Sequence, residues 1–341
     1  MTNPIPWIVA TATLGLVAFW PRHGLVARWR QARRLAARFR REDALKHILK
    51  CEANAQAPTL ESVSGALQIH RNEAAQLLQE MEQHGLVSFD QGRLRLRQPG
   101  RELGMHVIRA HRLWESYLAE QTGVAESEWH ERAERQEHLL TQQQADALAA
   151  QLGHPTHDPH GDAIPGLSGV LQADSGQPLN AAPVDEPLVI RHVEDEPLTI
   201  FAQIVAQGLR PGMKVVVIEK TPERVRFWAD GNEHILAPIL ANNIAVSPLP
   251  DLKTTDLFAE EYLSGLQPGQ QAKVLGLSPA CRGAERRRLL DLGFVPGTLL
   301  EVDMVSPGGD PTAYRVRGTV IALRREQANL VRISTRPAVT A

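Results

Sequence analysis

Two histidines and two glutamates near the middle of the chain share one face of a predicted helix. They are His130, Glu134, Glu137 and His138, at relative positions i, i+4, i+7 and i+8. At about 100° per residue, these side chains cover an arc of roughly 100° on the helix surface. Imidazole nitrogens and carboxylate oxygens on one face are a ligand set for manganese, iron or zinc. A solvated helix held by ion pairs between its turns would have the same composition, so the spacing alone leaves both interpretations open.

A second histidine–carboxylate pair lies on the preceding predicted helix, where His111 and Glu115 repeat the i, i+4 spacing. Three further histidines, His154, His157 and His160, follow in the proline-rich connector HPTHDPHGDAIPG. In such a connector we expect helix capping or turn chemistry rather than metal ligation. The candidate chemistry is therefore concentrated on the two helices.

Three short amphipathic helices are predicted before these pairs. Between residues 42 and 100 apolar side chains recur every three or four positions in three runs, and the alternating GRLRLR at 92–97 predicts a strand. Helix, helix, helix and hairpin is the order of a winged helix-turn-helix, a DNA-binding fold. Two more helices are predicted over 102–120 and 126–150, and these carry the histidine–carboxylate pairs. The apolar runs are Leu45, Ile48 and Leu49; Leu60, Val63 and Leu67; Leu77, Leu78 and Met81.

The C-terminal part of the chain changes to short strands. Residues 166–187 are rich in Gly, Ser, Pro and Asn and predict a linker. The run from Gly208 to Gly212, GLRPG, recurs as GLQPG from Gly265 to Gly269, and each copy leads into an alternating strand. This repeat predicts two copies of one small β-barrel. The fold class is therefore α+β.

The N-terminus predicts a membrane anchor. Residues 5–20 read IPWIVATATLGLVAFW, without a charge, and eight arginines and no acid follow between Arg22 and Arg41. Arginines after the apolar run would keep the rest of the chain in the cytoplasm, with the arginines along anionic headgroups. We therefore expect a single-pass protein of the inner (cytoplasmic) membrane with its body in the cytoplasm. A buried helix of a globular domain is the alternative.

Composition and charge exclude several classes of protein. The chain has 341 residues, 43% of them hydrophobic, and a net charge of −2, which excludes a fibrous or wholly disordered protein. Its two cysteines, Cys51 and Cys281, lie far apart and form neither a disulfide framework nor a CxxC motif. The sequence shows no nucleophile constellation, phosphate-binding loop or cofactor fingerprint, so we do not expect an enzyme.

Several motifs together resemble the diphtheria-toxin-repressor family of iron- and manganese-dependent regulators. They are HGLV, IRAHRLWESYL, AERQEH and GHPTHDPHGDAIPG, in the family's order between residues 42 and 165. Residues 188–249 look like the family's SH3-type barrel, and residues 263–333 look like a FeoA-type domain of the same barrel class. The opening segment, FWPRHGLVARW into REDALKHIL, is similar to the join between the last transmembrane helix of metal-uptake ABC permeases and a regulator-like tail. The expected parts are an anchor (1–21), a basic juxtamembrane segment (22–41), a winged helix-turn-helix (42–100), metal-binding and dimerisation helices (101–165), a linker (166–187), an SH3-like barrel (188–250) and a FeoA-like barrel (263–335).

The resemblance assigns the metal ligands by position. It implies a primary site of Asp43, Glu134, Glu137 and His138, and an ancillary site of His111, Glu115 and His130. The oxygens at the first two primary positions resemble the manganese type, so the implied cofactor is Mn²⁺ or Fe²⁺. Two departures favour one well-formed site over two. Lys46 replaces a carboxylate, and Pro197 and Ile200 stand where the barrel's own ligands should be, although Glu194 or Glu196 could substitute.

The DNA-reading residues also come from the resemblance. The recognition helix corresponds to residues 70–83, where Arg71 and Gln76 could reach bases. Arg93, Arg95 and Arg97 form a basic wing. The same helix carries Glu73, Glu80 and Glu82, and their carboxylates repel phosphate.

Two functions follow from these observations. The first is a membrane-tethered, metal-dependent repressor of metal-uptake genes that binds operator DNA as a homodimer through residues 102–150. The second is a metal-sensing domain that does not bind DNA and regulates a metal transporter by protein contacts. The acidic recognition helix and the permease-like opening favour the second, whereas the family resemblance and the basic wing favour the first.

Overall fold

The computed structural model describes residues 25–90, 92–166, 176–250 and 261–335. The chain forms two units, and the division falls between Ile108 and Arg109. Helix α5 (Gln98–Gln121) runs from the first unit into the second. We describe each unit by itself.

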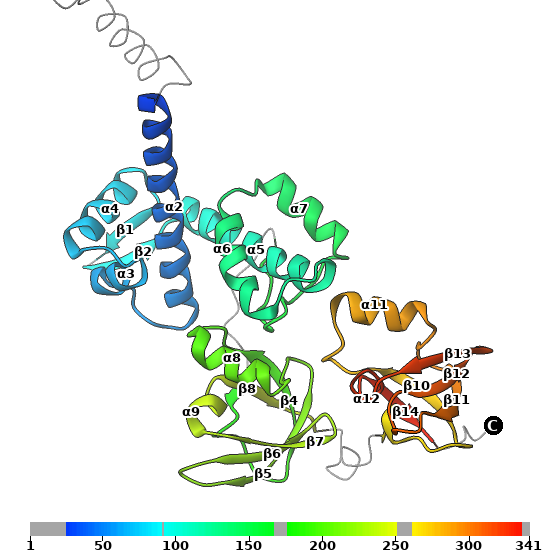
Figure 1. Cartoon of the computed structure of the whole chain (residues 1–341). Coiled ribbons are helices and arrows are strands. Elements are labelled where there is room, and N and C mark those ends of the chain that lie inside the picture. The colour runs from blue at the N-terminus through cyan, green and yellow to red at the C-terminus, as the bar shows by residue number, and fades with distance from the viewer. Residues whose placement is uncertain (1–24, 91, 167–175, 251–260, 336–341) are drawn as a thin grey trace, which may run out of the picture. The chain divides into compact units, whose positions relative to one another are not determined.

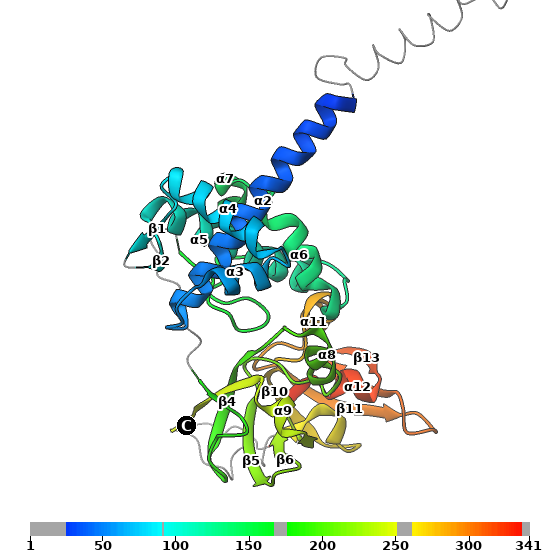
Figure 2. The same cartoon turned by 90° about the vertical axis from the view of Figure 1, so that its left-hand side faces the viewer.

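The first unit contains the expected winged helix-turn-helix (Figures 1 and 2). Its three helices and its hairpin enclose one core that includes Leu45, Ile48, Leu78 and Met81, all almost fully buried. A capping box between Thr59 and Ser62 begins the second helix. The elements are α2 (Leu25–Ala53), α3 (Leu60–Ala66), α4 (Arg71–Gln83), β1 (Val87–Asp90) and β2 (Arg93–Leu96).

Helix α2 joins two segments that the sequence analysis kept apart. The expected basic segment over 22–41 and the first helix of the winged fold are one continuous helix from Leu25 onward. Most of its side chains before Arg41 are exposed, with Trp29 at 57%, whereas Leu45 and Ile48 further along are fully buried. The helix therefore starts well before the part of it that packs into the core.

The prediction of a single-pass membrane location is wrong. The apolar run over 5–20, on which the predicted anchor depended, lies outside the described residues. Within the described ranges, no helix combines the length and the apolar character that crossing a bilayer requires. The longest described helix, α2, carries arginines throughout its first half, and such charges are costly in hydrocarbon. The predicted membrane contact through residues 5–20 depended on this location, and we no longer propose it.

The second unit begins with the rest of α5 and two short helices. The single helix expected over 126–150 is instead a turn and two helices: η1 (Glu126–Glu128), α6 (Trp129–Glu137) and α7 (Gln142–Gln151). The break has a local cause, because Thr141 and Gln144 form a capping box that starts a new helix. His138 consequently caps the end of α6 instead of continuing its face.

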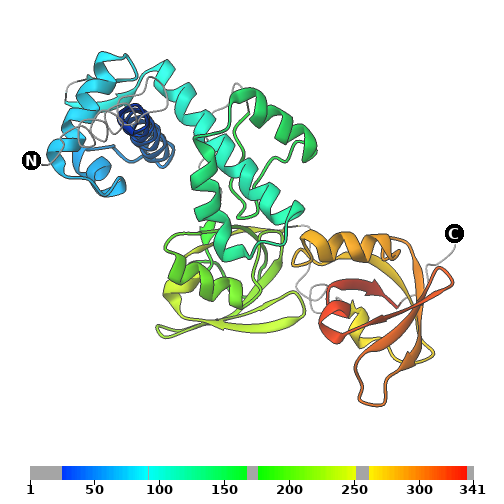
Figure 3. The same cartoon turned by 45° about the horizontal axis from the view of Figure 1, so that its top comes forward.

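Two antiparallel sheets complete the second unit, and they have the same strand order. The first β-domain spans residues 177–248 with the order β3-β8-β4-β5-β6-β7, and the second spans 261–334 with the order β9-β14-β10-β11-β12-β13. In both domains one helix follows the first long strand, and a shorter helix precedes the last strand. Figure 3 shows the longer helix of the second domain (orange) over its sheet. The strand orders agree with the repeat expected from the sequence.

Apart from the short turn η2, the elements of the two β-domains correspond one to one. The first contains β3 (Gln177–Pro178), β4 (Pro187–Val193), α8 (Leu198–Ala206), β5 (Lys214–Lys220), β6 (Val225–Ala229), β7 (Asn232–Leu236), α9 (Pro238–Ala241) and β8 (Ile244–Pro248). The second contains β9 (Glu261–Tyr262), η2 (Leu263–Gly265), β10 (Gln271–Leu277), α11 (Gly283–Asp291), β11 (Leu299–Val305), β12 (Thr312–Val316), β13 (Thr319–Leu323), α12 (Arg325–Ala328) and β14 (Val331–Ser334).

Each β-domain has a core of its own. Leu188, Ile190 and Phe227 are buried in the first, and Phe294 and Tyr314 in the second. The C-terminal part of the expected linker over 166–187 belongs to the first β-domain, because β3 pairs with β8 and Leu179 and Ala182 are fully buried.

Candidate metal centre

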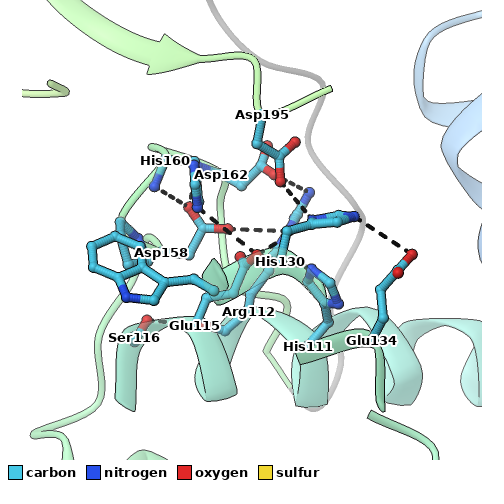
Figure 4. A network of polar contacts seen from close by, with 12 residues as sticks. His111, Arg112, Glu115, Ser116, His130, Glu134, Asp158, His160, Asp162 and Asp195 are labelled. Atoms are coloured by element: carbon cyan, nitrogen blue, oxygen red, sulfur yellow. Dashed lines mark hydrogen bonds and ion pairs between the residues drawn. The ribbon is translucent and has the colours of Figure 1, made fainter. Parts of the chain in front are cut away.

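The structure gathers histidines and carboxylates from four segments of the second unit (Figure 4). Helix α5 contributes His111 and Glu115, one turn apart on its buried face. Helix α6 contributes His130. The connector after α7 contributes His160, and the loop between β4 and α8 contributes Asp195. We call the four residues Glu115, His130, His160 and Asp195 the His130 cluster.

Glu115 lies at the centre of the His130 cluster and is 1% exposed. Its Oε1 atom lies 3.1 Å from His111 Nε2, 3.5 Å from His130 Nδ1 and 3.8 Å from His160 Nε2. Potential ligand atoms of Glu115, His160 and Asp195 lie within 4.8 Å of one another, and so do those of His111, Glu115 and His130. These separations suit ligands that converge on one cation.

The charges in the cluster favour a cation. Burial acts to raise the pKa of Glu115, but the surrounding imidazoles, His111 first among them, hold it well below its usual value. Burial also acts against the charged form of His130, but the nearby carboxylates, led by Asp195 at 2.7 Å, raise its pKa far above its usual value. The carboxylates thus require positive charge, which protonated imidazole or a metal ion can supply.

His160 is held in place from both sides. Its ring lies 6.1 Å from the Trp129 ring of α6 and 5.1 Å from the Phe201 ring of α8, measured between centroids. Its Nε2 atom is buried and makes no hydrogen bond to any described residue. A buried polar atom without such a partner is costly, so the atom is available to a ligand.

The backbone around His160 is fixed by a tight turn. Asp158 Oδ1 accepts hydrogen bonds from the His160 and Asp162 amides, each at 2.9 Å. Gly161 has a φ of +98°, and a Cβ atom there would overlap the Arg191 carbonyl. Glycine therefore allows this loop to approach β4, where the Val193 amide donates to the His160 carbonyl at 2.9 Å.

Asp158 adds a buried oxygen beside the cluster. Its Oδ2 atom has no hydrogen-bond partner among the described residues, and the Arg112 guanidinium is 3.8 Å away. Burial, together with the neighbouring carboxylates of Asp162 and Glu115, raises the pKa of Asp158 well above its usual value. A carboxylate in this situation would be stabilised by a cation.

A second group of donors lies at the end of α6. Glu137 and His138 are both buried, and His138 Nε2 lies 3.6 Å from Glu137 Oε1. The other Glu137 oxygen lies 2.5 Å from His111 Nδ1. The His111 ring therefore stands between Glu137 and Glu115 and connects this second group, which we call the His138 pair, to the His130 cluster.

The other residues considered in the sequence analysis come from α2, α6 and α8. Glu134 is exposed and lies 3.5 Å from His130 (Figure 4). Asp43 and Lys46 are half-buried on α2, in the first unit. Pro197 caps the start of α8 and Ile200 lies within it, so neither supplies a ligand.

Two participants were missed in the sequence. His160 was assigned to turn chemistry, which describes the exposed His154 and His157 but not this buried ring. Asp195 was passed over, although its neighbours Glu194 and Glu196 were considered as substitutes. In the structure Glu194 faces His192 at 3.6 Å, and Glu196 is 3.5 Å from His130, further than Asp195. The runs DPHGD and EDEP were the available signals for these two ligands. Adjacent side chains in a loop point in different directions, so the sequence alone does not show which of them faces the site.

The predicted DNA-contacting side chains are all exposed in the first unit. Arg71 begins α4 and lies 3.0 Å from Glu61, and Gln76 follows on the same helix. Arg93 and Arg95 lie on β2, and Arg97 directly follows that strand. The acidic side chains of Glu73, Glu80 and Glu82 are exposed on α4 as well.

Comparison with known proteins identifies two domain types in the chain. Residues 97–166 match the family model of the iron dependent repressor, metal binding and dimerisation domain, and residues 262–335 match the FeoA domain. The donors from α5, α6 and the connector thus lie in the region that matches the metal binding and dimerisation domain. The second β-domain matches the FeoA domain, and we call it the FeoA domain.

Similar whole proteins are metal-dependent repressors. The iron-dependent repressor IdeR of Mycobacterium leprae is 26% identical over 208 residues, covering 57% of this chain and 90% of that protein. A solved manganese-dependent transcriptional repressor in complex with manganese has the same fold over 61% of this chain and all of its own, with a TM-score of 0.56 at 24% identity. A probable metal transport system membrane protein of Chlamydia trachomatis is 41% identical over 81 residues, but these cover only 18% of that protein.

Proposed function

We propose that this protein is a metal-dependent, DNA-binding transcriptional regulator, a homodimer that represses metal-uptake genes. The observation that carries the proposal is the His130 cluster, a buried set of imidazoles and carboxylates in a domain whose family model is named for metal binding and dimerisation. Relatives similar over most of their own length are repressors rather than enzymes, which supports regulation instead of catalysis.

The donors favour Mn²⁺ or Fe²⁺. The His130 cluster and the His138 pair offer only oxygen and nitrogen atoms, and both cysteines of the chain are buried outside these groups. Oxygen and imidazole ligands suit manganese and ferrous iron, whereas thiolates would favour softer ions. The two repressors named above are, by their names, dependent on iron and on manganese.

Two sites are proposed. The first combines the His138 pair with Asp43 and Glu134, as the sequence resemblance implies. The second is the His130 cluster, with His111 between the two sites and Asp158 beside the second. When bound, a divalent ion supplies positive charge to carboxylates that come from separate segments. Because the ion binds only the form in which these segments are held together, binding stabilises that form by mass action. In the second site Asp195 replaces the barrel ligands that the sequence analysis found missing.

DNA would be bound by the winged helix. The exposed Arg71 and Gln76 would face bases and the arginines of the wing would face phosphates, while the acids of α4 reduce the attraction of the helix for DNA. Specific binding would then depend strongly on the fixed spacing of two recognition helices in a dimer.

We also propose that both β-domains belong to the SH3-like barrel class.

Fluorescence anisotropy tests this function. DNA from the gene's own upstream region is titrated with the full chain in the presence of Mn²⁺, Fe²⁺ or a chelator, at physiological salt. Metal-dependent binding that unrelated DNA does not compete away is the expected result. Tight metal binding without selective DNA binding would contradict the repressor and favour a sensor that acts through protein contacts.

A further inference from the structure

The loop 278–282 and helix α11 of the FeoA domain contact two segments that supply the His130 cluster. The first segment is the connector, which carries His160. The second is helix α5, which carries Glu115 and is contacted at its C-terminal end. All of these parts belong to the second unit. No metal ligand has been assigned to the FeoA domain itself. Its contacts are nevertheless directed at backbone atoms close to the ligands.

Arg282 holds the connector. Its guanidinium donates a hydrogen bond to the Pro159 carbonyl at 3.0 Å, and Pro159 is the residue between Asp158 and His160. A charged donor makes a stronger hydrogen bond to a carbonyl than a neutral one does. The bond therefore restrains the peptide that sets the position of the His160 ring.

Arg287 holds the end of α5. Its guanidinium donates to the Glu120 carbonyl at 2.5 Å and to the Gln121 side-chain oxygen at 3.1 Å. The last carbonyls of a helix lack partners within the helix, and a cation there interacts favourably with the helix dipole. Glu115 lies little more than one turn earlier on the same helix, so this contact restrains its position.

Close packing accompanies the two arginines. Gly283, at the start of α11, has a φ of +55°, and a Cβ atom there would lie 3.0 Å from the Ala119 carbonyl of α5. Glycine thus allows α11 to meet the end of α5 directly.

The loop 278–282 is also tied to the β-domain that provides Asp195. Asp230 of the first β-domain accepts hydrogen bonds from the Ser278 hydroxyl and from the Tyr262 hydroxyl, the latter at 2.6 Å. Three of the four segments that supply the cluster, namely α5, the connector and the first β-domain, are therefore hydrogen-bonded to the FeoA domain.

We propose that the FeoA domain braces the His130 cluster, with Arg282 and Arg287 as positioning residues for the metal ligands. The inference rests on the proposed metal-binding function. Because binding free energies are reciprocal, a metal ion in the cluster must strengthen the docking of α11 as much as docking strengthens metal binding.

Calorimetric titration with MnCl₂ tests the brace. The full chain with His138→Ala, which weakens the other site, is compared with the same chain carrying Arg282→Gln and Arg287→Gln. We expect the double substitution to lower manganese affinity at the remaining site at least tenfold. Arg288→Gln, which changes the same charge at an exposed position of α11, is the matched control and should leave affinity unchanged.

Two further comparisons separate positioning from general stability. Arg282→Lys keeps a charged donor and should restore part of the affinity lost in Arg282→Gln, whereas equal losses would contradict a specific bond to Pro159. Unchanged manganese affinity in the folded double variant would overturn the brace. If the His138→Ala parent itself bound no manganese, the proposed site would have failed rather than the brace.

Hydrogen exchange of the unsubstituted chain gives a test that needs no variant. Saturation with Mn²⁺ should slow exchange of the amides of α11 and of loop 278–282 relative to those of β13, which pairs with β12. Manganese binding without slower exchange in α11 would contradict the brace, even if the double variant did not fold.

Discussion

The two β-domains have the same strand order, yet their equivalent loops have opposite charge. In each domain a loop connects the first long strand to the longer helix: residues 194–197 in the first and 278–282 in the second. The first loop is acidic and brings Asp195 to 2.7 Å from the His130 ring. The second brings Arg282 to the Pro159 carbonyl, next to His160.

This difference shows what the repeated fold determines and what it leaves to individual residues. The topology directs both loops toward the metal-binding domain. A carboxylate in that position can act as a ligand, whereas a guanidinium cannot ligate a cation and binds backbone oxygen instead. The duplicated domain thus provides a ligand from one copy and a support from the other.

Loss of the carboxylate at the centre of the His130 cluster should have the largest effect. Glu115→Gln removes the carboxylate around which the imidazoles gather. We expect manganese affinity of the His130 cluster to fall by about 100-fold or more, since even groups that only support ligands cost 10- to 100-fold. Calorimetry in the His138→Ala chain measures it. Glu131→Gln, exposed on α6 and paired with Arg135, is the control, and an equal loss there would refute the specific role of Glu115.

Loss of the acidic loop's ligand should have the next largest effect. Asp195→Asn keeps the shape of the side chain but removes the charge beside His130, and we expect about a tenfold loss of manganese affinity. Glu194→Gln, in the same loop but facing His192, should change it little. If Glu194→Gln had the larger effect, the assignment of the ligand within this loop would be wrong.

The helical half of the site was accessible to sequence reasoning, and the loop half was not. His111, Glu115, His130, Glu137 and His138 were identified because helical periodicity places residues four apart on one face. His160 and Asp195 come from irregular segments, where no period relates sequence position to direction. Periodicity also predicted a helix that continues past His138. The structure ends the helix there, because the capping box at Thr141 is a local feature that outweighs the continuing pattern.

Weakening the connection between the two β-domains should have a smaller effect. Asp230 has a φ of +46°, which asparagine tolerates, so Asp230→Asn tests the charge without straining the backbone. Weaker hydrogen bonds from Ser278 and Tyr262 should cost about 1–3 kcal/mol of stability and lower manganese affinity less than Asp195→Asn does. Urea unfolding and calorimetry measure the two effects. Asp303→Asn, whose carboxylate pairs with Arg315 within the FeoA domain, should leave metal affinity unchanged.

The smallest effect is expected at Glu134. This side chain is 52% exposed and lies 3.5 Å from His130 Nε2. Exposed ion pairs contribute about 0–1 kcal/mol, so Glu134→Gln should lower manganese affinity of the His130 cluster less than about fivefold, the equivalent of 1 kcal/mol. A loss as large as that of Glu115→Gln would show that Glu134 is itself a ligand of this cluster.

Anomalous scattering tests most directly whether the His130 cluster binds metal. Crystals of the full chain grown with MnCl₂ are measured on both sides of the manganese absorption edge, and the difference map locates the ion. We expect a manganese peak among Glu115, His130, His160 and Asp195. Manganese found only at exposed carboxylates, with none among these four side chains, would contradict the assignment.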